Sequence, residues 1–117
     1  MKTTRLTLTK LWFNLIRKGT KTEEYREITP YYCSRLCANY DKNSSFCQNC
    51  AKDYCRPTPK VDAIHFTLGY PRDDQQERHM ICTVEEIRKG YGKILHGAPR
   101  HRCFIIKLGI VFYNGRD

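Results

Sequence analysis

The sequence predicts an α+β fold: a mixed sheet of about five strands that closes into a small β-barrel, with two short helices near the N-terminus. Segments in which polar and apolar residues alternate recur along the chain, as expected of half-buried strands. Two N-terminal segments instead carry helix signals. Gly109 interrupts the last strand-like segment, and glycine inside a strand is typical of a bulge or a barrel bend. A chain of 117 residues can bury one modest core, so we expect a single domain over residues 1–117.

The first three elements follow from periodicity. Residues 5–9 alternate and are rich in threonine, which predicts a short strand. Residues 10–18 change to a helical period, with Trp12 on the apolar stripe, and Gly19 can adopt the left-handed conformation that ends a helix. Residues 21–28 extend as a second strand, which puts alternate side chains on opposite faces.

The remaining elements begin with a second helix. Thr29 and Pro30 are typical of a helix start and predict a helix at residues 31–37. Residues 38–60 are polar, rich in cysteine and contain two prolines, so we interpret them as an insertion without an extensive core of its own. Three further strands are predicted at residues 61–68, 78–87 and 102–113.

The charge balance favours polyanionic partners. Twenty-one lysines and arginines against 12 aspartates and glutamates give a net charge of +9 at pH 7. Because each neutralised phosphate releases condensed counterions, this excess favours RNA or a nucleotide as the partner. No apolar run reaches the ~18 to 20 residues needed to cross a bilayer, and the N-terminus has no signal-peptide core. We therefore expect a cytoplasmic protein with no membrane partner, in which clustered thiols indicate a metal site before disulfides.

Five of the seven cysteines form what we call the cysteine cluster: Cys33, Cys37, Cys47, Cys50 and Cys55. The tight turn from Cys47 to Cys50 is suited to two thiolates on one ion, and Cys33 and Cys37 would share a helix face. We expect structural zinc bound by four of these five, because an ion would also staple a polar insertion. The alternatives are free thiols, or core packing of the first two cysteines. Core packing is also our interpretation for the other two, Cys82 and Cys103.

The stretch from Trp12 to Arg26 carries a family resemblance. It reads Trp12-Phe13-x-x-Ile16-x-x-Gly19-x-Lys21-Thr22-x-Glu24-Tyr25-Arg26 and is followed by Pro30-Tyr31. This pattern resembles the hallmark of ASCH domains, especially the small phage and bacterial forms. The resemblance continues through Phe66-x-x-Gly69-Tyr70, Gly90-x-Gly92 and Ile106-Lys107-Leu108-Gly109, and it covers most of the chain except residues 38–60.

The resemblance implies a PUA-like β-barrel with a cleft lined by the G-x-K loop and the E-Y-R strand that follows it. RNA binding has been proposed for the family, and a few small members are amidohydrolases that deacetylate N4-acetylated cytidine with a Lys, a Thr and a Glu. Lys21 matches the family lysine, but Glu24 stands where those enzymes have threonine. The family glutamate could be Glu85 or Glu86.

The departure at Glu24 bears on the chemistry of an enzyme. A lysine with a lowered pKa can activate a neighbouring hydroxyl, whereas a carboxylate in that place would pair with Lys21 and hold it protonated. Thr22 offers another hydroxyl, and Glu24 could instead act as a base on water. If the chain is an enzyme, we expect the catalytic residues to be Lys21, Glu24 and Glu85.

As a binding site, the same stretch has chemistry suited to a nucleobase. Lys21 and Arg26 can contact a phosphate or a base edge. Glu24 can accept a hydrogen bond from an exocyclic amine such as cytosine N4, and Tyr25 offers a stacking face. The alternative is that residues 21–26 form internal salt bridges between the strand and the helix.

Two other basic segments could extend the site. Tyr70 and Arg72 form a second aromatic-basic pair that could line the same cleft. Residues 96–102 form a basic loop that is either a phosphate-contacting rim or a solvent-exposed surface. We therefore expect RNA or nucleotide binding, with two alternatives: an amidohydrolase acting on an N4-acylated cytidine, and a zinc-supported protein-interaction module.

Overall fold

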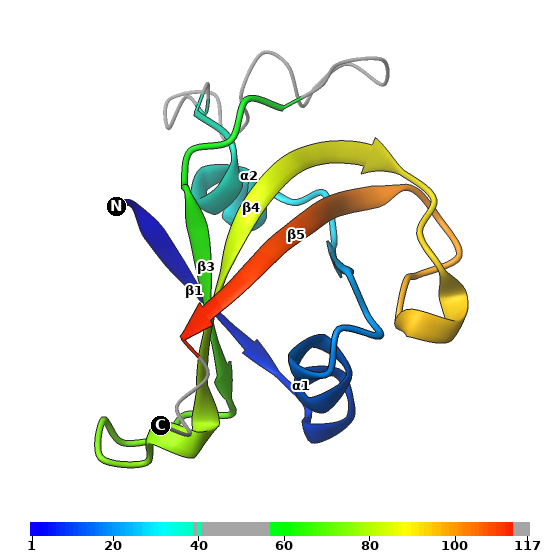
Figure 1. Ribbon diagram of the computed structural model, residues 1–117. Coiled ribbons are helices and arrows are strands. Elements are labelled where there is room, and N and C mark those ends of the chain that lie inside the picture. Colours follow the sequence, from blue (N-terminus) through cyan, green and yellow to red (C-terminus); the bar gives the residue numbers. More distant parts are fainter. Residues whose placement is uncertain (39, 41–56, 114–117) are drawn as a thin grey trace.

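The computed structural model describes residues 1–38, 40 and 57–113 and has the α+β architecture expected. A five-stranded sheet curls into a half-barrel, and two helices pack against it (Figure 1). The strands are β1 (Thr3–Leu8), β2 (Glu23–Arg26), β3 (Ala63–Leu68), β4 (His79–Gly90) and β5 (Cys103–Tyr113). The helices are α1 (Lys10–Arg17) and α2 (Pro30–Leu36), and two short 3₁₀ helices, η1 (Gln76–Arg78) and η2 (Ile94–His96), precede β4 and β5. The five strands and the two N-terminal helices are thus confirmed.

The curl of the sheet brings its two edges together. The strand order is β1-β3-β4-β5-β2, so β1 and β2 are the edges. β1 runs parallel to β3, and every other pair is antiparallel. The long β4 and β5 curve strongly, which carries β2 round toward β1 (Figure 1). A guanidinium nitrogen of Arg26 in β2 lies 2.7 Å from the main-chain oxygen of Thr7 in β1, so a side chain bridges the seam.

The bulge in β5 is built around Gly109. The register of the β4–β5 ladder shifts between Cys82 and Val84, where β5 has an extra residue. A Cβ at Gly109 would lie 2.4 Å from the hydroxyl oxygen of Thr83, which leaves no room for a side chain. The same hydroxyl accepts a hydrogen bond of 2.8 Å from the main-chain N–H of Ile110. The bulge predicted from the glycine is therefore confirmed.

The two helices are bounded by the signals in their sequences. In α1, Phe13 and Ile16 are buried, and Gly19 follows in the left-handed conformation with φ of 83°. In α2, the hydroxyl of Thr29 accepts a hydrogen bond of 3.2 Å from the main-chain N–H of Tyr32, and a proline is the first helical residue. The second strand is shorter than predicted, because only the four residues of β2 pair with β5.

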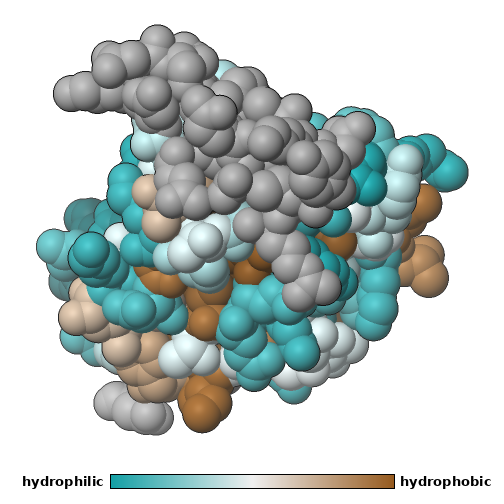
Figure 2. Space-filling model, turned by 90° about the horizontal axis from the view of Figure 1, so that it is seen from above, coloured by the Kyte–Doolittle hydropathy of each residue, from teal (hydrophilic) through white to brown (hydrophobic). Residues whose placement is uncertain are grey.

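The core packs both helices against the sheet. Its large members include Leu6, Phe66, Phe104 and Ile106 from the strands and Phe13, Ile16 and Leu36 from the helices. Cys82 and Cys103 are fully buried, which confirms the core packing predicted for them. In the described part of the chain no helix is long and apolar enough to cross a membrane. Seen from above, the described residues are mostly hydrophilic around small hydrophobic areas (Figure 2).

The two ends of the insertion meet beside the end of α2. The main-chain N–H of Ala38 donates to the carbonyl of Thr58 at 2.8 Å, and the N–H of Lys60 donates to the carbonyl of Leu36 at 2.9 Å. Most of the predicted insertion, residues 39 and 41–56, lies outside the described residues.

Candidate functional site

A cleft of about 340 Å³ opens at the seam between β1 and β2, and we call it the first cleft. It is lined by Thr7, Leu8, Thr9, Trp12, Lys21, Glu24, Tyr25, Arg26, Glu27, Tyr32, Gly97 and Pro99. These residues come from both edge strands, both helices, the loop before β2 and the loop after η2. The structure therefore gathers the predicted residues of the G-x-K loop and the E-Y-R strand at one site.

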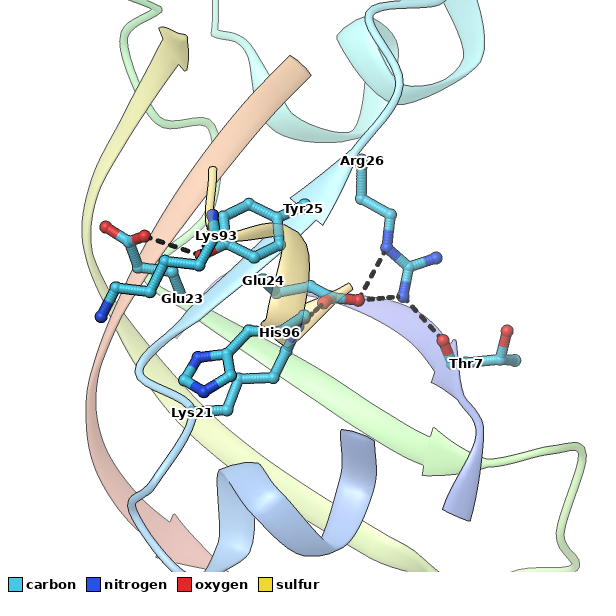
Figure 3. Close-up of polar contacts among 8 residues, drawn as sticks. All are labelled: Thr7, Lys21, Glu23, Glu24, Tyr25, Arg26, Lys93 and His96. Carbon is cyan, nitrogen blue, oxygen red and sulfur yellow. Dashed lines mark hydrogen bonds and ion pairs between the residues drawn. The ribbon is translucent and has the colours of Figure 1, made fainter. Parts of the chain in front are cut away.

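Lys21 is among the residues that line this cleft and is buried, with 2% of the residue exposed. Its ammonium nitrogen lies 3.2 Å from Glu24 Oε1 and donates to the main-chain carbonyl of His96 (Figure 3). The same nitrogen lies 4.7 Å from the ring centroids of both Trp12 and Tyr25. Burial lowers the pKa of Lys21 because it disfavours the charged form, and the neighbouring carboxylate of Glu24 opposes that shift.

Glu24 joins Lys21 to Arg26 in a chain of ion pairs. Its second carboxylate oxygen, Oε2, accepts hydrogen bonds from Nη2 and Nε of Arg26 at 2.7 and 3.1 Å (Figure 3). Glu24 and Arg26 are two residues apart on β2, so they project from the same face of the strand. Only 7% of the Glu24 side chain is exposed, so the carboxylate is held in a largely desolvated place between two cations.

Arg26 also reaches two elements beyond its own strand. Besides the carbonyl of Thr7, it contacts Tyr32 in α2, because Nη1 donates to the tyrosine hydroxyl at 3.2 Å. The guanidinium carbon lies 5.6 Å from the centroid of the Tyr32 ring. Internal salt bridges are therefore present, but they join residues of β2 and the loop before it and not the strand to a helix, as the alternative predicted. The same residues line the first cleft.

Tyr25, whose ring lies next to the Lys21 ammonium, is held in place by two hydrogen bonds of its hydroxyl. Its hydroxyl donates to Glu23 Oε1 at 2.9 Å and accepts from the main-chain N–H of Lys93 at 3.2 Å. Burial raises the pKa of Tyr25 to about 12. Its ring also packs on Gly92, where an added Cβ would lie 2.3 Å from Cε1. Only 7% of Tyr25 is exposed, so little of the ring face predicted for stacking is open to a ligand.

Trp12 is the aromatic side chain that the sequence analysis did not assign to the site. It lies half-buried in the wall of the first cleft, although its sequence position indicated only the apolar stripe of a helix. Gly97, with φ of 96°, packs on it, since an added Cβ would lie 3.0 Å from the indole ring. The signal that could have found Trp12 is its place at the start of the motif that continues to Lys21.

The other predicted residues lie away from the first cleft. Tyr70 is 95% exposed and lines a neighbouring cleft of about 350 Å³, which we call the second cleft. Arg72 is exposed and pairs with Asp74 at 3.3 Å. Glu85 is half-exposed, with its carboxylate 3.5 Å from Lys107 Nζ, and it does not line the first cleft.

The remaining acidic candidate and the basic loop are also placed by ion pairs. Glu86 pairs with Arg88 at 3.2 Å and does not line the first cleft. In the basic loop, Nε2 of His101 lies 2.6 Å from Oε2 of Glu27, which is one of the residues that line the first cleft. The main-chain carbonyl of His96 accepts a hydrogen bond from Lys21.

The cysteine cluster is only partly described. Cys33 in α2 and Cys37 at the C-terminal end of this helix are almost fully buried in the core. Cys47, Cys50 and Cys55 lie outside the described residues. Within the described ranges no three His, Cys, Asp or Glu side chains gather in a way that could hold a metal ion. The zinc site therefore stays a prediction.

Comparisons with protein-family models, with curated proteins and with solved structures found no match to this chain. The chemistry of the first cleft therefore rests on its own residues. They offer a carboxylate that accepts hydrogen bonds, two cations that donate them, and an indole ring at the wall.

Proposed function

We propose that the chain is an ASCH-like domain with a PUA-like fold that binds RNA or a nucleotide, and that one base enters the first cleft. The observation that carries this proposal is the chain of ion pairs Lys21–Glu24–Arg26 in the lining of a cleft of about 340 Å³. Small-molecule sites have volumes of about 300 Å³ and above, and they combine apolar walls with a few placed polar groups.

The ion pairs favour a binding role over a purely structural one. Buried ion pairs contribute little net stability, because desolvation of the two charges offsets their attraction. Because these groups line a cleft, they can serve recognition: Glu24 can accept from an exocyclic amine, and Arg26 can donate to a ring nitrogen or carbonyl. Lys21, which is more deeply buried, holds Glu24 in place. The net charge of +9 supports a polyanionic ligand over a neutral one.

Trp12 supplies both a stacking surface and a means of measurement. An indole ring at the wall of a cleft can stack on any base, which gives affinity without base selectivity. Trp12 is also the single tryptophan of the chain, so its fluorescence reports on this cleft alone.

The test is to titrate the purified protein with the four ribonucleosides and their monophosphates, and to measure binding by calorimetry and by the fluorescence of Trp12. We expect at least one base to bind, and Glu24→Gln to weaken it about tenfold, because an acceptor-only carboxylate is replaced by an amide of the same size. Glu77→Gln is the matched control, since Glu77 is exposed on η1 and lines neither cleft. Absence of binding by every nucleoside and nucleotide would show that the proposal is wrong.

A second candidate is an amidohydrolase acting on an N4-acylated cytidine. The observation that favours it is Lys21, whose pKa is lowered by burial and whose ammonium lies 3.2 Å from a carboxylate in a cleft. Glu24 would take a proton from water as the water oxygen attacks the acyl carbonyl. The C–N bond to N4 then breaks, N4 receives the proton, and the carboxylic acid leaves.

This candidate is tested by incubating the protein with N4-acetylcytidine and following acetate and cytidine by chromatography. Lys21→Met and Glu24→Gln should each abolish turnover, whereas Glu85→Gln, away from the cleft, should retain it. If the wild-type chain releases no acetate, the first cleft is not a hydrolase site for this substrate.

A further inference from the structure

The second cleft adjoins the first and shares a wall with it. Its volume is about 350 Å³, and Thr7, Arg26 and Tyr32 line both clefts. A ligand that occupied both would therefore pass over the seam between β1 and β2. A nucleotide has this layout, because its base and its phosphate are joined through one ribose.

The two clefts differ in charge. The first cleft contains the carboxylates of Glu24 and Glu27. Among the described residues, none that lines the second cleft is acidic, whereas Arg5 and Arg35 line it in addition to the shared Arg26. Because Glu24 neutralises Arg26 at 2.7 Å, the excess positive charge of the second cleft comes from the other two arginines.

These two arginines are available to a ligand. Arg5 and Arg35 are both exposed, and in the described ranges neither is paired with a carboxylate. The guanidinium carbon of Arg35 lies 5.0 Å from the centroid of the Tyr31 ring, which also lines the second cleft. A cation held over an aromatic ring keeps its N–H groups directed outward at a small entropic cost. The highly exposed Tyr70 also lines the second cleft.

We infer that the second cleft binds a phosphate group, and that Arg5 and Arg35 are the residues that hold it. This inference rests on the proposed function, because the phosphate belongs to the nucleotide whose base enters the first cleft. The planar fork of arginine matches two phosphate oxygens, and a site without carboxylates does not repel the anion. The ligand is thus a nucleotide unit, and the phosphate is either the monoester of a free nucleotide or the diester of an RNA chain.

The experiment compares ligands with and without phosphate. Calorimetry is run with the nucleoside of the preferred base, with its 5′- and 3′-monophosphates, and with a short single-stranded RNA of the same base. We expect the wild-type chain to bind the phosphorylated ligands about tenfold or more tightly than the nucleoside, since charge-assisted hydrogen bonds to phosphate are the strong ones. This preference should shrink between about 50 mM and about 300 mM salt.

The variants assign the preference to the second cleft. In the double variant Arg5→Gln, Arg35→Gln, the phosphorylated ligands should bind no more tightly than the nucleoside, and the affinity for the nucleoside should stay at the wild-type value. Arg78→Gln is the matched control, because Arg78 is exposed on η1 and lines neither cleft. It should keep the full preference for phosphate.

The possible outcomes separate this inference from the proposed function. A nucleoside that binds as tightly as its nucleotides overturns the phosphate site but leaves the base site standing. A preference that survives in the double variant also overturns it, because the phosphate would then be held elsewhere. If neither nucleosides nor nucleotides bind, the proposed function is wrong and the phosphate site with it. A preference shown by a monophosphate indicates the terminal phosphate, and one shown by the RNA alone indicates a diester.

Discussion

Replacement of Arg26 by alanine should destabilise the whole fold, because this side chain joins the two edges of the sheet. Its Nη2 lies 2.7 Å from the carbonyl of Thr7 in β1 and 2.7 Å from Glu24 Oε2 in β2, and its Nη1 contacts Tyr32 in α2. Only 14% of the arginine side chain is exposed. Arg26→Ala therefore removes one partner of a largely buried ion pair and two contacts between elements.

The expected loss follows from these contacts. Removing one partner of a buried ion pair lowers the free energy of unfolding by about 3–5 kcal/mol. Lys21 remains 3.2 Å from the other oxygen of Glu24 and still compensates part of its charge, so we expect the lower end, about 3 kcal/mol. For a domain of this size that corresponds to a fall in melting temperature of roughly 10 °C.

Urea unfolding followed by Trp12 fluorescence and by circular dichroism measures this change. Arg72→Ala is the control, because its pair with Asp74 is exposed and should contribute no more than about 0.5 kcal/mol. If Arg26→Ala loses no more stability than Arg72→Ala, the contact across the seam does not hold the half-barrel together. Glu24→Gln also removes a partner from Lys21 and Arg26, so binding by this variant is measured only after circular dichroism shows that it is folded.

Three further predictions concern other parts of the protein. Gly92→Ala should lower the free energy of unfolding by about 2 kcal/mol in thermal melts, because its Cβ would lie 2.3 Å from the Tyr25 ring, whereas Gly90→Ala meets only an ordinary contact at 3.5 Å and should be neutral. Burial lowers the pKa of His65 below 6.5, so on acidification the unfolded chain is protonated at this residue before the folded chain. The free energy of unfolding should therefore fall as the pH drops below about 6.5, and His65→Asn should weaken this pH dependence in urea melts. An equal pH dependence in the variant and the wild-type chain would refute this role of His65. Elemental analysis of protein purified without chelators should find one zinc per chain, bound by four members of the cysteine cluster, and a metal-free protein would contradict that prediction.

Local pattern was sufficient for the elements of this fold. The strand pattern around Phe66, the cap at Thr29 and the glycine in β5 each report on a few neighbouring residues, and the strand, the cap and the bulge are found as predicted. The strand is buried on both faces, however, so the predicted alternation of its burial is not seen. The face shared by Glu24 and Arg26 also follows from strand periodicity, so half of the ion-pair chain could be expected from the sequence.

The parts that could not be predicted depend on contacts between distant segments. The sequence does not show that β1 pairs in parallel with β3, from which 54 residues separate it. The periodicity of a strand indicates its buried face but not the strand with which it pairs. The carbonyl of Thr7 reaches Arg26 only through the curl of the whole sheet. Trp12 reaches the same cleft from α1, and a helical stripe does not distinguish the core from the wall of a pocket.

A histidine pair shows the same limit. His65 and His79 face each other across β3 and β4, with Nε2 of the first 2.9 Å from Nδ1 of the second. Nε2 of His79 lies 3.1 Å from the carbonyl of Arg72 and must donate to it, so in the neutral pair His65 is the donor. In the sequence the two residues stand apart and carry no visible relation.

The closure of the insertion at its base has a consequence for engineering the chain. The hydrogen bonds of Ala38 and Lys60 tie the two ends together, so the chain leaves the half-barrel and returns to it at neighbouring points. Changing the length of such a loop alters mainly its closure entropy, which grows only slowly with length. We therefore expect the half-barrel to fold when residues 41–56 are exchanged for a short glycine-serine linker. The shortened domain would show which properties belong to the cleft and which to the cysteine cluster.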